Sequence, residues 1–160
     1  MKKLLGRAFV LGLQINAALT RSQRLVVLEQ RCLTPFFVWV TRLVRGAPRE
    51  MPKEGDASAL GKEWERLLGA GPYAQVTHVD LESGTAYGEI RGRCPLRGTG
   101  DLEACQRLMA YDRRLLAPYG ARFVVLRSQA EKGRTRCEVA IRNANRPHED
   151  LIPAHRLQRS

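Results

Sequence analysis

TAYGEIRGRCPLRGTGDLEACQRLMAYD, residues 85–112, is the stretch that decides the fold, because it changes from the period of a strand to the period of a helix. Small or apolar residues alternate up to Cys94, as in a strand with one buried side, and Pro95 then ends the pairing. Asp101 follows a glycine-rich turn and has a side chain typical of a helix N-cap. We expect the helix to run to about Leu116.

The segments on either side of this stretch complete one pattern of helices and strands. Residues 59–71 have the apolar spacing of a short helix, and residues 73–82 alternate as a strand that a Ser-Gly turn joins to the next one. Residues 121–130 and 135–143 alternate in the same way around a second turn. The order predicts an α+β domain over residues 59–145, in which a four-stranded antiparallel sheet has helices packed on one face.

Three further regions flank the predicted domain. In residues 1–46, apolar residues recur mostly three or four apart with basic residues largely opposite, which predicts a basic amphipathic helical arm whose last helix opens at Pro35. Residues 47–58 are rich in proline and charge and predict a linker. Residues 146–160 are expected to form a mobile C-terminal tail.

The charge of the chain indicates an anionic partner. It has 27 Lys and Arg against 16 Asp and Glu, a net charge of +11, and +7 of this falls within the first 50 residues. A small anionic substrate or ligand, and a membrane surface or acidic protein bound through residues 1–46, are the partners we consider. Nucleic acid is not expected, because no recognised reader motif is present. Trp39, Phe36 and Phe37 would otherwise serve as core or homo-oligomer contacts.

The four cysteines are expected to be free thiols in a cytoplasmic protein. Small secreted disulfide scaffolds are denser in cysteine, and Arg7, Gln14 and Asn16 interrupt the first apolar run, so that it makes a poor signal peptide or membrane span. A peripheral position at the membrane is the alternative location, because a basic amphipathic helix with aromatic residues can lie on an anionic bilayer.

One acid and three thiols are directed toward the same layer of the predicted domain. Helical spacing places Asp112 on the same face as Cys105, and strand alternation turns Cys94 and Cys137 toward the core. These four residues are the catalytic candidates, with Asp112 as general base and a thiol as nucleophile or substrate contact. The alternative is structural: Asp112 anchors a loop or an arginine, and the cysteines fill the core.

The remaining candidates concern ligand binding. Arg91 or Arg127 would hold a carboxylate through the two donors of its guanidinium group, and His78 and Ser128 complete the substrate-binding set. No cofactor is expected. Zinc held by Cys94, Cys105 and Cys137 with Asp112 or a histidine is a minor alternative, because the chain has neither a CxxC pair nor a local HxxxH.

Four pieces of sequence between Tyr87 and Arg142 carry a resemblance to a known family. They are RCPL (93–96), EACQRLMAYD (103–112), LRS (126–128) and KGRTRCEV (132–139). The stretch resembles the family named for L-2-amino-thiazoline-4-carboxylic acid hydrolase, whose members carry Cys-Pro after a strand, a Cys and then an Asp on a helix, Arg-Thr, and a turn before Cys-Asp-Phe. Ser128 stands where Thr is usual, and Glu138 and Val139 replace Asp and Phe.

The resemblance implies a hydrolase-like pocket near Cys94, Cys105, Asp112 and Cys137 that opens a small amino-acid-derived ring at a C–N or C–S bond. A weaker resemblance is to the 4-vinyl reductase type of ligand-sensing domain, which also has a turn followed by a Cys-containing strand. That resemblance implies a non-enzymatic small-molecule-binding, sensor or accessory domain, docking through its basic helical arm to a membrane or an acidic partner. Fold analogy alone does not decide between them.

Overall fold

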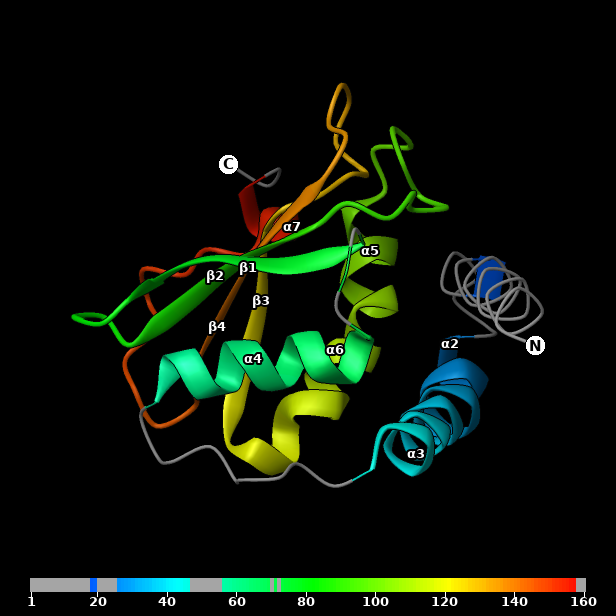
Figure 1. Ribbon diagram of the computed structural model, residues 1–160. Helices are drawn as coiled ribbons and strands as arrows, with labels where there is room; N and C mark the ends of the chain where they lie inside the picture. Colours follow the sequence, from blue (N-terminus) through cyan, green and yellow to red (C-terminus); the bar gives the residue numbers. More distant parts are fainter. Residues whose placement is uncertain (1–17, 20–25, 47–55, 70, 72, 158–160) are drawn as a thin grey trace.

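The structure is a computed structural model that describes residues 18, 19, 26–46, 56–69, 71 and 73–157 (Figure 1). Its helical elements are α2 (Val26–Leu28), the π-helix η1 (Glu29–Leu33), α3 (Thr34–Arg45), α4 (Ala57–Leu68), α5 (Leu102–Leu108), α6 (Ala110–Leu116), the 3-10 turn η2 (Ala117–Tyr119) and α7 (Ala154–Leu157). The strands are β1 (Ala74–Asp80), β2 (Thr85–Ile90), β3 (Ala121–Arg127) and β4 (Cys137–Asn143).

The four strands form one antiparallel sheet in the order β1-β2-β4-β3. The predicted α+β fold is therefore confirmed. Alternation decides which side of the sheet is buried: Ala86, Phe123, Val139 and Ile141 face the core, while Tyr87 and Arg142 lie on the other face. Helix α4 packs across β1, β2 and β4, and α6 packs against β3.

Helix α4 approaches the sheet closely because two glycines lie at the contact. A Cβ on Gly61 would come within 2.9 Å of Val76 Cγ2, and a Cβ on Gly88 would come within 2.8 Å of the Trp64 ring. Real Cβ contacts are essentially never this short, so larger residues at either position would push the helix from the sheet. Trp64 is fully buried as a result, with its ring centroid 6.0 Å from that of Phe123.

The helix predicted after Asp101 is present but is divided in two. The Asp101 carboxylate accepts a hydrogen bond from the Ala104 N–H at 2.8 Å, as expected of an N-cap. The backbone leaves the helical region at Met109, where ψ is 5°, and α6 begins at the next residue. The break changes the direction of the chain between Cys105 and Asp112, although both side chains remain buried.

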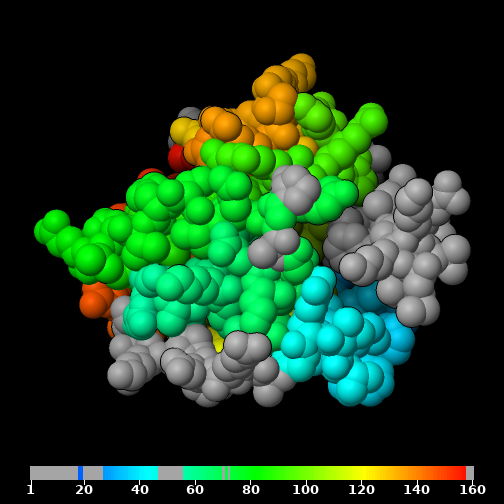
Figure 2. Space-filling view, in the orientation of Figure 1, coloured from blue at the N-terminus to red at the C-terminus, as the bar shows by residue number. Residues whose placement is uncertain are grey.

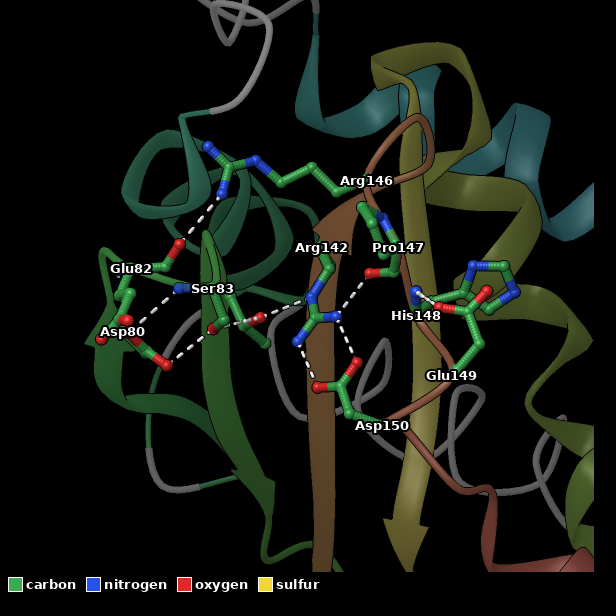
Figure 3. A network of polar contacts seen from close by, with 10 residues as sticks. Asp80, Glu82, Ser83, Arg142, Arg146, Pro147, His148, Glu149 and Asp150 are labelled. Carbon is green, nitrogen blue, oxygen red and sulfur yellow. Dashed lines mark hydrogen bonds and ion pairs between the residues drawn. The ribbon is translucent and has the colours of Figure 1, made fainter.

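The C-terminal residues 146–157 differ from the predicted mobile tail, because they pack against the domain. The Arg142 guanidinium, 3 % exposed, donates to the carbonyl oxygen of Pro147 at 2.6 Å and forms a two-point ion pair with Asp150 (Figure 3). Its Nε also donates to Thr85 Oγ1 at 2.6 Å. Leu151 is buried, and α7 contacts α5 and β3.

The described part of the predicted arm also packs against the domain. Thr41 Oγ1 and Tyr111 Oη lie 2.6 Å apart, and Arg42 donates to the carbonyl oxygen of Arg114 at 3.1 Å, so α3 is held along α6. Residues 1–17 and 20–25 of the arm, and residues 47–55 of the predicted linker, lie outside the described residues. Helix α4 begins at Ala57, inside the predicted linker.

Candidate functional site

Three cysteines from separate elements meet around residues 128 and 129, just beyond β3. Ser128 Oγ donates to Cys105 Sγ at 3.0 Å, and the Gln129 N–H donates to Cys137 Sγ at 3.3 Å. The Cys94 N–H in turn donates to Gln129 Oε1 at 3.2 Å. The structure thus brings Cys94, Cys105, Cys137 and Ser128 together, and the hydrogen-bonding role of Gln129 had no signal in the sequence pattern.

The thiols of this cluster are poor nucleophiles at neutral pH. Burial raises the pKa of Cys105 to about 11 and that of Cys137 to about 12, and the hydrogen bonds that they accept offset only part of this increase. Burial also raises the pKa of Cys94. Because the thiolate is the reactive form, the cluster as it stands favours packing over nucleophilic catalysis.

Asp112 lies in the core between α4 and α6. This residue is 6 % exposed, and the Trp64 indole N–H donates to its Oδ1 at 3.1 Å. Burial raises the pKa of Asp112 to about 6, against the opposing effects of the Trp64 hydrogen bond and the Arg113 charge. A carboxyl group with this pKa can exchange a proton near neutral pH, which is a property of general bases and of buried structural acids alike.

Arg113 is the cation that interacts electrostatically with both Asp112 and Cys105. Its guanidinium group donates to the side-chain and main-chain oxygens of Gln106, at 3.2 and 2.5 Å, and burial lowers its pKa. Neighbouring residues on a helix do not face each other, so helical spacing gave no reason to pair Arg113 with Asp112.

The other predicted ligand-binding residues lie away from the thiols. Arg91 is exposed and forms an ion pair with Glu89 at 2.9 Å. Arg127 is exposed at the end of β3, and His78 is exposed on β1, where it stacks on Tyr87 with centroids 4.5 Å apart. Of this set, only Ser128 contacts the cysteine cluster.

A metal site finds no support in the described geometry. Among the residues that the structure describes, no group of three or more His, Cys, Asp or Glu side chains is arranged to hold a metal ion. The N–H and O–H donors around the cysteines point at their sulfur atoms, as Ser128 does at Cys105. This arrangement suits a protonated or hydrogen-bonded thiol.

Helix α3 presents its polar side to the protein and its apolar side outward. Val38, Thr41 and Arg42 lie toward α6. The opposite side has exposed fractions between 36 % and 73 % and consists of Phe36, Phe37, Trp39, Leu43 and Val44, which we call the apolar face of α3. Figure 2 shows α3, in cyan, at the molecular surface beside α4.

The apolar face continues into a shallow hollow between α3 and the end of α6. The hollow has a volume of about 350 Å³, and Val38, Trp39 and Pro118 contribute to its lining. Contiguous exposed apolar patches on soluble domains mark binding sites for proteins or membranes. The part of the chain that the structure describes contains no helix long and apolar enough to cross a membrane.

Comparisons of the chain with protein-family models, with curated proteins and with solved structures find no match. A proposal about its function therefore depends on the geometry described above.

Proposed function

We propose that the protein is a non-enzymatic accessory protein that docks on an anionic membrane surface through the apolar face of α3. The observation that carries the proposal is the inverted orientation of α3, with Trp39 59 % and Leu43 68 % exposed while Val38 is buried. A surface helix of a globular protein normally turns its apolar stripe to the core.

The composition of the arm supports a bilayer as the binding partner. Interfacial helices combine Trp, Phe and Leu on one side with basic residues that meet anionic headgroups. The first 50 residues carry a net charge of +7, and burial of each large apolar side chain contributes about 2 kcal/mol. Trp39 is the type of residue that concentrates at membrane interfaces, because its ring is apolar and its N–H is polar.

Sedimentation with vesicles tests this proposal. The full chain is expected to bind vesicles of equal parts phosphatidylcholine and phosphatidylglycerol, and Leu43→Gln is expected to weaken binding at least tenfold because it places an amide in the apolar layer. Leu81→Gln is the matched control, because Leu81 is 81 % exposed on the turn between β1 and β2, away from α3.

Equal binding by both variants, or no binding by the unchanged chain, would overturn the membrane proposal. Concentration-dependent dimer formation that Leu43→Gln abolishes, without vesicle binding, would instead identify a second copy of the chain as the partner. Each outcome is measurable by sedimentation without knowledge of a ligand.

A second candidate function is hydrolysis of a small amino-acid-derived ring at a C–N or C–S bond. The observation that favours it is the pKa of Asp112, about 6, beside Cys105 and Arg113. Asp112 would accept a proton from a water molecule that adds to the ring carbon, and the ring nitrogen or sulfur would leave with a proton. It ranks second because Asp112 is 6 % exposed and its carboxyl group is already bonded to Trp64.

Turnover of 2-amino-thiazoline-4-carboxylate tests the second candidate. The candidate predicts ring opening by the unchanged chain and its loss in Asp112→Asn, with the fold retained. No turnover by the unchanged chain, or equal turnover by the variant, would remove Asp112 as the general base of this reaction.

A further inference from the structure

One end of the sheet carries a dense group of basic side chains. Residues 91–100, which follow β2, and residues 127–136, which join β3 to β4, form what we call the basic platform. Its seven cationic residues are Arg91, Arg93, Arg97, Arg127, Lys132, Arg134 and Arg136. Figure 1 shows the two loops extending beyond the same end of the sheet.

Hydrogen bonds tie the two loops of the basic platform together. The N–H groups of Gly98 and Gly100 donate to the carbonyl oxygens of Gln129 and Ala130, both at 2.8 Å. The Gln129 side chain donates back to the carbonyl oxygen of Gly92 at 2.8 Å. The cations of the two loops are thus carried on one connected backbone, which reduces the ordering cost of binding.

The carboxylates near the basic platform are already paired with its other arginines. Glu89 pairs with Arg91 at 2.9 Å and with Arg136 at 3.2 Å. Arg134 pairs with both Glu131 and Glu138. These acids therefore do not neutralise the rest of the platform.

Four exposed cations remain, and in the described part of the chain their side chains have no ion-pair or hydrogen-bond partner: Arg93, Arg97, Arg127 and Lys132. Residues 89–100 and 127–138 together hold seven cationic and three acidic side chains, a net charge of +4. A surface of this sign attracts anions over about the Debye length.

The basic platform and helix α3 lie at the same end of the domain. Arg66, in the last turn of α4, donates to the carbonyl oxygens of Arg45 and Gly46 at the end of α3, at 2.6 and 3.2 Å. The chain passes from α4 to the start of β1, where the Tyr73 carbonyl oxygen accepts from the Arg91 N–H at 2.6 Å. Short links therefore connect the apolar face of α3 with the platform.

We infer that the basic platform binds the anionic headgroups of the membrane on which α3 docks. The inference rests on the proposed function and adds a second, electrostatic contact to it. A bilayer is favoured over a polynucleotide because the neighbouring helix presents Phe36, Trp39 and Leu43, which suit an apolar layer and have no partner on a phosphate backbone.

Vesicle binding of platform variants tests the inference with the full chain. Arg93→Gln combined with Arg97→Gln is expected to lower the affinity for vesicles of equal parts phosphatidylcholine and phosphatidylglycerol by about 25-fold at low salt, about fivefold for each cation. Binding to pure phosphatidylcholine vesicles is expected to stay unchanged. The matched control removes two exposed cations elsewhere, Lys62→Gln on α4 with Arg156→Gln on α7.

The alternative outcomes separate this inference from the proposed function. If the platform variant binds the anionic vesicles as tightly as the unchanged chain while Leu43→Gln does not, the inference fails and the membrane proposal stands. If the unchanged chain binds neither vesicle, both fail. If single-stranded RNA binds and only the platform variant loses it, with vesicle binding unaffected, the platform is a polynucleotide site and the inference is wrong.

Discussion

Replacing Asp112 with Asn should stabilise the protein at neutral pH, although it removes a charge from the centre of the fold. Burial raises the pKa of Asp112 from its ordinary value of 3.8 to about 6, so the folded state holds this proton more tightly than the unfolded chain does. A pKa difference of about two corresponds to about 3 kcal/mol. The substitution opens no new cavity, because the amide has nearly the same size as the carboxyl group and its oxygen can still accept from Trp64.

The sign of this effect gives a pH profile that only a raised pKa produces. The folded protein is most stable, relative to the variant, below about pH 4, where Asp112 is protonated in both states. This contribution falls as the pH rises from about 4 through about 6, and above that the variant is more stable by up to about 3 kcal/mol.

Urea unfolding of both proteins at a series of pH values between about 4 and 8 measures this difference. The difference is needed because other groups with lowered pKa, such as Asp80 and Asp150, change the stability of both proteins equally. A difference that does not change with pH, or a variant that is less stable at pH 8, would refute the reasoning that burial dominates at Asp112.

Three further outcomes follow from the packing. Gly88→Ala should cost about 1–3 kcal/mol in urea unfolding, because its Cβ would meet the Trp64 ring at 2.8 Å; an unchanged midpoint would contradict the close approach of α4. Arg142→Met should release the C-terminal segment and speed its amide hydrogen exchange, whereas unchanged exchange would show that the ion pair does not hold it. Maleimide at neutral pH should label the exposed Cys32 well before Cys105, whose pKa is about 11, and equally fast labelling would contradict the buried cluster.

The sheet could be predicted from the sequence because local signals agree there. Both hairpins alternate small or apolar residues with polar ones, and Asp101 caps the helix between them as its side chain indicates. The convergence of the cysteines followed from the same alternation, since Cys137 and Val139 share the buried side of β4. Periods of two and of three to four residues were sufficient for this part.

The remainder depends on partners distant in the sequence or on the direction in which a helix packs. Nothing in the residue types near Met109 marks the break between α5 and α6, because neither glycine nor proline lies there. The ordered C-terminal segment depends on Arg142, on a strand, meeting Asp150, on a loop. An amphipathic pattern identifies α3 as a helix, but its period does not say that the apolar side faces outward.

Quenching of Trp39 by brominated lipid tests the proposed docking of α3 most directly. The chain has two tryptophans, and the other, Trp64, is fully buried, so a change at the exposed indole reports on α3. Vesicles of phosphatidylglycerol and phosphatidylcholine with brominated acyl chains should quench the Trp39 emission, and Trp39→Phe should remove this quenching. Cosedimentation of the protein with these vesicles without quenching of Trp39 would contradict insertion of the apolar face of α3.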